Sequence, residues 1–143
     1  LHTNSAQGTV NRIIDAFPGN LQDQIRTQLS TALICIVAQQ LLPRISGGRV
    51  AAYETLVVTP GVSNLIRENK TFRINSAIQT GGKFGMKLMD DSLFDLWRDN
   101  KVLVEDALAR AHRPDDLAQR IVNYKRGLLE EGSGNGDEGE VPQ

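Results

Sequence analysis

The sequence is poor in the residues that most often build metal and catalytic sites. Its 143 residues include one cysteine, Cys35, and two histidines, His2 and His112. The histidines have no cysteine or carboxylate at ligand spacing, so we expect no metal site. A single cysteine cannot form an internal disulfide, which fits a reducing compartment. Cys35 lies in the apolar run ALICIVA, where we expect it to be buried.

Charge and aromatic content exclude further classes of partner. Lysine and arginine number 16 and aspartate and glutamate 17, which gives no electrostatic reason to expect nucleic acid or an anionic membrane as the main partner. Aromatic residues make up 5%, too little for the stacking platforms that bind single-stranded nucleic acid. No apolar run approaches the ~18 residues of a membrane-spanning helix. The opening LHTNSA has neither a methionine nor a leader, so we expect the chain to be part of a longer protein.

The first 60 residues combine helical and strand periods. Apolar residues at i, i+3, i+4 and i+7 predict a helix over 5–17, and a second stripe predicts a helix over 21–36. VAQQLLPRI and RVAAYETLVV, joined by SGG, predict a β-hairpin. The second strand is apolar on both faces, so we expect it to be covered on both sides. Glu54 interrupts that strand, and its carboxylate needs a partner or a wet cleft.

After Thr59-Pro60 the pattern is helical throughout. Apolar stripes predict helices over 61–69, 71–80, 84–98 and 104–111 and a last helix that begins at Pro114. The tail EEGSGNGDEGEVPQ is rich in glycine and acids, which is typical of disorder. We therefore expect an α/β fold with three parts, in which 1–60 is mixed, 61–126 is all-helical and 127–143 is a disordered acidic tail.

Two polar segments, one at the start of the chain and one past its middle, are candidates for binding a nucleotide. TGGKFG, residues 80–85, lacks the Ser or Thr that follows Gly-Lys in a phosphate loop, and a glycine turn between two helices explains it better. LHTNSA, residues 1–6, is either a helix-capping segment with an incidental histidine or a polar strand-end loop that faces a nucleotide. The residues alone leave both interpretations of LHTNSA open.

The segment SNLIRENK, residues 63–70, is a candidate for binding another protein. It is either an ordinary surface helix with solvated charges or a docking helix. In the second interpretation Leu65 and Ile66 are buried by a partner that Arg67 and Glu68 select.

Three longer segments together resemble one family. LHTNSA, IVAQQLLPRISGGRVAAYETLVVTPGVSNLIREN and SAIQTGGKFGMKLMDDSL are similar, in the same order, to the C-terminal half of the PilT-type pilus retraction ATPases. These are the twitching-motility members of the secretion ATPase superfamily. The resemblance covers about residues 1 to 122. LHTNSA resembles the end of the family's histidine box and GGRVAAYE its hairpin. The family's A-I-R-N-L-I-R-E motif is matched at Asn64, Leu65, Ile66, Arg67 and Glu68, whereas Gly61, Val62 and Ser63 depart from it.

The resemblance implies a fold and a mechanism. Residues 1–60 would be the C-terminal portion of a RecA-like ATPase domain, and 61–126 a helical C-terminal subdomain. The whole protein would be a homo-hexameric motor, cytoplasmic and peripheral to the inner membrane, that uses ATP and Mg to drive pilus retraction through a platform protein in that membrane. The catalytic residue would be His2, which ends a segment that senses the terminal phosphate. The partner-binding residues would be Asn64, Leu65, Ile66, Arg67 and Glu68.

The resemblance also limits what these residues do alone. The family's Walker A loop, acidic box and Walker B segment would lie before Leu1, so we expect the 143 residues to bind ATP poorly and to be inactive by themselves. Extension and secretion relatives usually carry a four-cysteine zinc module, which a chain with Cys35 alone cannot form; this favours the retraction branch. The alternative is a non-enzymatic, truncated or divergent relative that acts as an interaction or regulatory module of the pilus or secretion motor.

Overall fold

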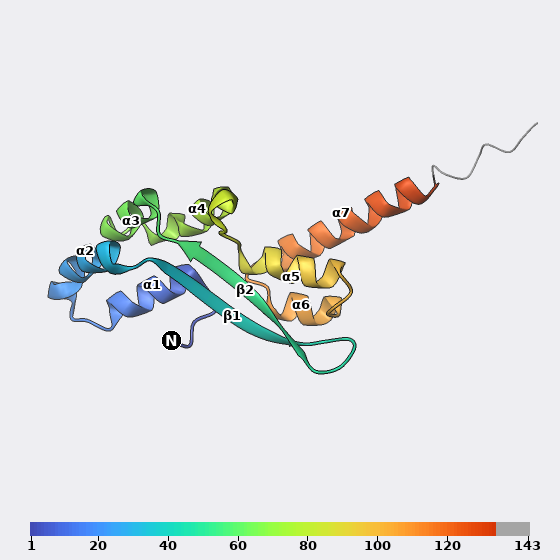
Figure 1. Ribbon diagram of the computed structural model, residues 1–143, viewed down its shortest axis with the longest axis horizontal. Helices are drawn as coiled ribbons and strands as arrows, with labels where there is room; N and C mark the ends of the chain where they lie inside the picture. The colour runs from blue at the N-terminus through green and yellow to red at the C-terminus, as the bar shows by residue number, and fades with distance from the viewer. Residues whose placement is uncertain (134–143) are drawn as a thin grey trace, which may run out of the picture.

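A long two-stranded hairpin runs through the middle of the molecule, with helices at both ends (Figure 1). The computed structural model describes residues 1–133, and their side chains through 128. Strands β1 (Cys35–Pro43) and β2 (Arg49–Val57) pair antiparallel along their full length. Gly47 and Gly48 in the connecting turn have φ of 96° and 72°, a conformation that glycine adopts without steric cost. The predicted hairpin is therefore confirmed, and SGG is its turn.

The first group of helices packs at the open end of the hairpin, in blue to yellow-green in Figure 1. It consists of α1 (Ala6–Asp15), η1 (Gly19–Leu21), α2 (Gln22–Ala32), α3 (Pro60–Arg67), η2 (Thr71–Arg73), α4 (Ile74–Thr80) and η3 (Gly82–Phe84). Ser5 caps α1 by accepting a hydrogen bond from the Gly8 amide, and Thr59 caps α3 with Pro60 at its first position, both common helix starts.

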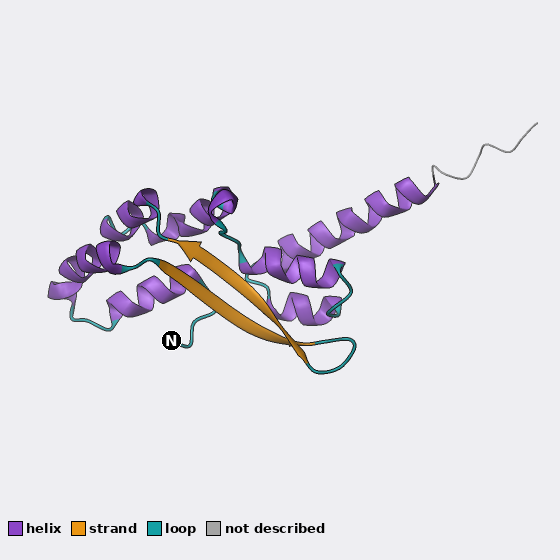
Figure 2. Ribbon diagram, viewed as in Figure 1, coloured by secondary structure: helices purple, strands orange, loops and turns teal. Residues whose placement is uncertain are grey.

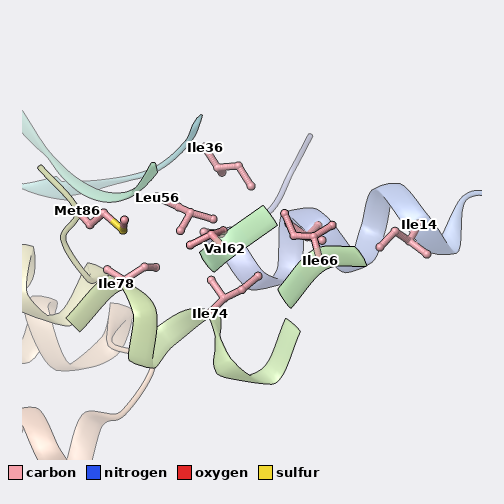
Figure 3. Packing of buried hydrophobic residues seen from close by; sticks show 10 residues of the cluster. Ile14, Ile36, Leu56, Val62, Ile66, Ile74, Ile78 and Met86 are labelled. Atoms are coloured by element: carbon pink, nitrogen blue, oxygen red, sulfur yellow. The ribbon is translucent and has the colours of Figure 1, made fainter. Parts of the chain in front are cut away.

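The helices of this group share one apolar core with the hairpin. Figure 3 shows it between α1, α3, α4 and the strands, and its buried members are Ala6, Val10, Ile14, Ile36, Leu56, Val62, Ile66, Ile74, Ile78 and Met86. This core takes residues from both sides of Pro60. The division of the chain into domains at Pro60 stays a prediction, but side-chain packing does not divide there.

A second group of helices covers the turn end of the hairpin. It consists of α5 (Met89–Arg98), α6 (Val104–Arg110) and α7 (Pro114–Ser133). Its buried core is formed by Leu42, Ala52, Met89, Leu93, Phe94, Val102, Ala107, Leu117 and Ile121. The rings of Phe94, Trp97 and Tyr124 lie 5.6–5.8 Å apart and join α5 to α7. Beyond these contacts α7 projects from the body (Figure 2).

The two strands differ from expectation in where they begin and what covers them. Helix α2 ends at Ala32, so Ile36 lies in β1 rather than on the second helix. The run from Ile34 to Val37 is rich in β-branched residues, which favour strands. The outer face of the hairpin is open: Val37 is 59% and Tyr53 44% exposed. The expectation that β2 is covered on both sides is therefore wrong for this chain, and Cys35, on the same outer face, is exposed rather than buried.

Two helix boundaries also differ. The predicted helix over 84–98 begins only at Met89, because Gly85 has a φ of 83° and Lys87 pairs with Thr55 in an isolated β-bridge. Helix α7 continues through 127–133, so these residues are helical and not part of a disordered tail as the composition predicts. Residues 134–143, where the rest of that prediction falls, lie outside the described residues. No helix within 1–133 is both long enough and apolar enough to cross a membrane.

Candidate functional site

Glu54 of β2 is the buried acid that the sequence singled out, and two helices satisfy it. Its side chain is fully buried. Oε1 accepts a hydrogen bond of 2.7 Å from the Ala6 amide, and Oε2 accepts one of 3.1 Å from the Met89 amide. Ala6 and Met89 are the first residues of α1 and α5, where backbone N–H groups lack partners inside the helix and the helix dipole favours a negative charge. The partner that the sequence required is thus a pair of helix amino ends.

The segment between α6 and α7 lies beside Glu54. Nδ1 of His112 is 3.8 Å from Glu54 Oε2. Asp90, in the first turn of α5, accepts hydrogen bonds of 2.8 and 2.9 Å from the His112 and Arg113 amides. These bonds fix the start of α7 against the start of α5. A cavity of about 160 Å³ remains here, lined by Glu54, Asn75, Ser76, Gln79, Leu88, Asp90, His112 and Arg113.

The segment that carries His2 is held close to α1. The Arg12 Nη1 donates a 3.4 Å hydrogen bond to the His2 carbonyl oxygen, and the hydroxyls of Thr3 and Thr9 are 2.6 Å apart. The side chain of His2 is exposed. LHTNSA therefore acts as a capping segment through Ser5, one of the two interpretations that the sequence left open. A role of His2 toward a nucleotide stays a prediction.

The amino end of α1 offers only part of a phosphate cradle. Such a cradle needs free backbone N–H groups at the first turn. The Ala6 amide is already bonded to Glu54, and the Gly8 amide to the hydroxyl of Ser5 at 3.0 Å. Of the residues predicted to face ATP, His2 has an exposed imidazole, which would meet a phosphate as a hydrogen-bond donor.

Helix α3 separates the five residues predicted to bind a partner. Ile66 has no exposed surface and belongs to the first core. It follows Val62 by four residues, and this spacing places both on the inward face of the helix. The expectation that a partner buries Ile66 is therefore wrong in this chain, because its own core already does. Asn64, Arg67 and Glu68 are exposed and Leu65 is half-buried.

The exposed residues of α3 border two grooves. Asn64 and Arg67 line a hollow of about 450 Å³ between α2 and α3. Leu65 lines another, of about 330 Å³, on the other side of the helix, with Phe84 at its rim. Sequence reasoning missed Phe84, which is 52% exposed; its only signal was an aromatic residue in a glycine turn. Charges and apolar surface are thus both accessible around α3.

Charges at the end of α3 interact locally. Glu68 Oε2 accepts a 2.8 Å hydrogen bond from Lys70 Nζ. This hydrogen bond and the charge of Lys70 lower the pKa of Glu68 from its ordinary value. Among the side chains described, those of residues 1–128, no group of three or more from histidine, cysteine, aspartate or glutamate is placed to hold a metal ion.

Comparison with known proteins finds sequence relatives of this chain, although no family model matches it. It is 44% identical over 119 residues to a twitching motility protein of Neisseria gonorrhoeae. The aligned segment is 82% of this chain and 32% of that protein. It is 41% identical over 117 residues to the type IV pilus retraction ATPase PilT of Pseudomonas aeruginosa. This alignment includes 82% of this chain and 34% of that protein.

Solved structures agree with these relatives. The crystal structure of the pilus retraction motor PilT with bound ADP superposes with a TM-score of 0.74 at 41% identity, over 83% of this chain and 33% of that one. The Legionella pneumophila ATPase DotB superposes with a TM-score of 0.62 over 75% of this chain and 29% of that one. At 20% identity, DotB supports the fold alone.

The hairpin and its two groups of helices are the fold of the C-terminal portion of these ATPases. More narrowly, the chain is homologous over 82% of its length to proteins named for twitching motility and pilus retraction. It spans about a third of the length of the relatives it matches.

Proposed function

We propose that this chain is the C-terminal, mechanical portion of a homo-hexameric ATPase that powers type IV pilus retraction. The observation that carries the proposal is 41–44% identity to proteins named for twitching motility and pilus retraction. ATP and Mg²⁺ bind, in this proposal, to the part of the complete protein that precedes the segment matched here. ADP in the PilT crystal structure supports nucleotide use by the family.

His2 acts at the nucleotide in this proposal. Its exposed imidazole donates a hydrogen bond to the charge that develops on the terminal phosphate, where a placed donor lowers the barrier. The hydrogen bond from Arg12 to the His2 carbonyl and the cap at Ser5 hold the segment on α1. His2 is the residue of this chain that contributes to hydrolysis, and the reaction needs groups beyond it.

Helix α3 transmits the motion to a partner. Asn64, Arg67 and Glu68 present polar groups and charges, and Leu65 adds apolar surface beside the groove that Phe84 borders. The partner is the platform protein in the inner membrane, which the motor meets from the cytoplasmic side. Ile66 contributes indirectly, by fixing α3 on the core.

A second candidate is a non-enzymatic relative that joins or regulates the motor. The departures at Gly61, Val62 and Ser63 from the family motif favour it. So does the failure of TGGKFG to match a phosphate loop within these 143 residues.

The gene sequence before the codon of Leu1 separates the two candidates. An in-frame strand followed by G-x-x-x-x-G-K-[ST] supports the motor. A start codon directly before Leu1 supports the non-enzymatic module and rejects the motor.

A further inference from the structure

Glu54 lies at the seam between the two apolar cores. Ala52 and Leu56, two residues to either side of it, share its face of β2 because side chains alternate along a strand. Ala52 belongs to the core around α5–α7, and Leu56 to the core around α1, α3 and α4. The carboxylate therefore stands where one core ends and the other begins.

Each carboxylate oxygen of Glu54 accepts a hydrogen bond from a helix that belongs to a different apolar core. Oε1 accepts from the Ala6 amide of α1, and Oε2 from the Met89 amide of α5. Hydrogen bonds from backbone N–H groups at a helix start to a carboxylate are among the stronger ones, and the side chain of Glu54 has no exposed surface. The amino ends of α1 and α5 thus share one rigidly placed acceptor.

The α5 side of this junction is fixed twice. Besides the bond from Met89 to Glu54, Thr55 and Lys87 exchange both backbone hydrogen bonds, of 2.9 and 3.1 Å. The bridge fixes the residues that lead into α5 onto the strand next to Glu54. On the other side, Ala6 follows His2 by four residues, so its bond to Glu54 ties the histidine segment to the same point.

We infer that Glu54 is a positioning residue that holds the segment carrying His2 in register with α5. Displacement of the amino end of α1 then moves α5 and the helices packed on it, and displacement of α5 moves the amino end of α1. Glu54 acts through Ala6 and contacts no nucleotide. The inference rests on the proposed function for its catalytic consequence, whereas the coupling itself is a property of the chain.

The coupling is tested by amide hydrogen exchange, followed by NMR, in the full 143-residue chain. Glu54→Gln keeps the size of the side chain but leaves one acceptor oxygen for two N–H donors. We expect the protection factors of the Ala6 and Met89 amides to fall together, each by about tenfold or more. Unchanged protection at either amide would overturn the inference.

Asp90→Asn is the matched control. Asp90 also accepts two backbone hydrogen bonds, from His112 and Arg113, but it contacts no residue of α1 by hydrogen bond. We expect protection to fall at His112 and Arg113 and to stay at wild-type level at Ala6. A fall at Ala6 as large as in Glu54→Gln would mean that general loosening, not Glu54, carries the effect.

Ala6→Pro keeps the test decisive if Glu54→Gln does not fold. Proline is tolerated at the first helical position, and Ser5 before it is extended, with φ −143° and ψ 154°, as a residue before proline prefers. The change removes the N–H that bonds to Oε1, and the ring Cδ, which takes the place of the hydrogen, pushes that oxygen away while Glu54 itself is unaltered. We expect protection to fall at the distant Met89 amide, and unaltered protection there would refute the coupling.

The catalytic consequence is tested in the complete product of the gene. A misplaced His2 weakens an interaction made in the transition state, so Glu54→Gln should lower kcat for ATP about tenfold or more with KM unchanged. A kcat equal to that of the wild type would overturn the positioning role. If the wild-type product hydrolyses no ATP, the proposed function fails, while the amide exchange results still decide the coupling.

Discussion

The hydroxyl of Ser63 donates a 2.6 Å hydrogen bond to the carbonyl oxygen of Ser30. Ser30 lies in the last turn of α2 and is 3% exposed, so the bond joins α2 to α3. Ser63 is one of the three positions at which the chain departs from the family motif. In this chain the departure has a structural use, because it fixes the helix that we propose to contact the partner.

Ser63→Ala is expected to destabilise the chain by about 1 kcal/mol, the usual net value of one intramolecular hydrogen bond. Chemical denaturation of the two proteins measures the difference. Asn64→Ala, the next residue and an exposed one, serves as the control and should change stability by less than about 0.5 kcal/mol. Equal stability of Ser63→Ala and wild type would show that the bond contributes nothing to the docking of α3.

Substitutions on α3 should separate motion from hydrolysis. In the complete gene product, Leu65→Ala and Arg67→Ala are expected to impair pilus retraction more than ATP turnover, because both side chains border grooves on the surface. Retraction in cells and turnover of the purified protein are compared. Equal loss of both activities would mean that α3 is only core structure.

Ile66→Ala provides the contrast on the same helix. Its side chain is fully buried, so truncation should cost about 2–5 kcal/mol of folding stability and reduce both activities with it. Thermal unfolding measures the loss. A stable Ile66→Ala variant with selective loss of retraction would indicate that Ile66 meets the partner after rearrangement.

Arg120 should anchor α7 through its guanidinium plane. The group lies 4.1 Å from the centroid of the Phe94 ring and forms an ion pair with Asp91. Arg120→Ala is expected to lower stability by about 0.5–1 kcal/mol through the loss of the cation–π contact. Asp91→Asn removes the ion pair alone, and because the pair is exposed it should cost less. If the two variants lose the same stability in denaturation, the ring contact contributes nothing.

The pKa of Glu68 should depend on Lys70. The hydrogen bond from Lys70 and its charge lower this pKa below the ordinary value of 4.5. A depressed carboxyl pKa favours the folded state above the unfolded pKa, and this contribution disappears as the pH falls through the folded pKa, so any effect lies in the acid range below 4.5. In Lys70→Ala the midpoint, followed by carboxyl carbon NMR, should rise toward 4.5. The same midpoint in both proteins would contradict the ion pair.

Local chemistry in the sequence was enough to predict the hairpin and most helices. The SGG turn and the apolar stripes of α1 and α3 are short-range signals, and the structure has a hairpin turn and helices there. The start of α5 was missed because the Lys87–Thr55 bridge pairs residues far apart in the chain. Cys35 was misplaced because an apolar run does not reveal which face of a hairpin remains open.

The candidate site was predictable only in part. The buried position of Glu54 indicated that a partner must exist, but the donors are the backbone amides of Ala6 and Met89, which have no side-chain signature. Ile66 was assigned to a partner because the motif match treats all five residues alike, whereas the period of the helix divides them between core and surface. Packing, not residue type, made that distinction.

Steady-state ATP turnover with Mg²⁺, measured side by side for the complete gene product and for the isolated 143 residues, tests the central claim most directly. If the chain is the mechanical portion of a retraction motor, the complete product hydrolyses ATP and the isolated residues do not. Hydrolysis by the isolated residues, or none by either protein, would contradict it.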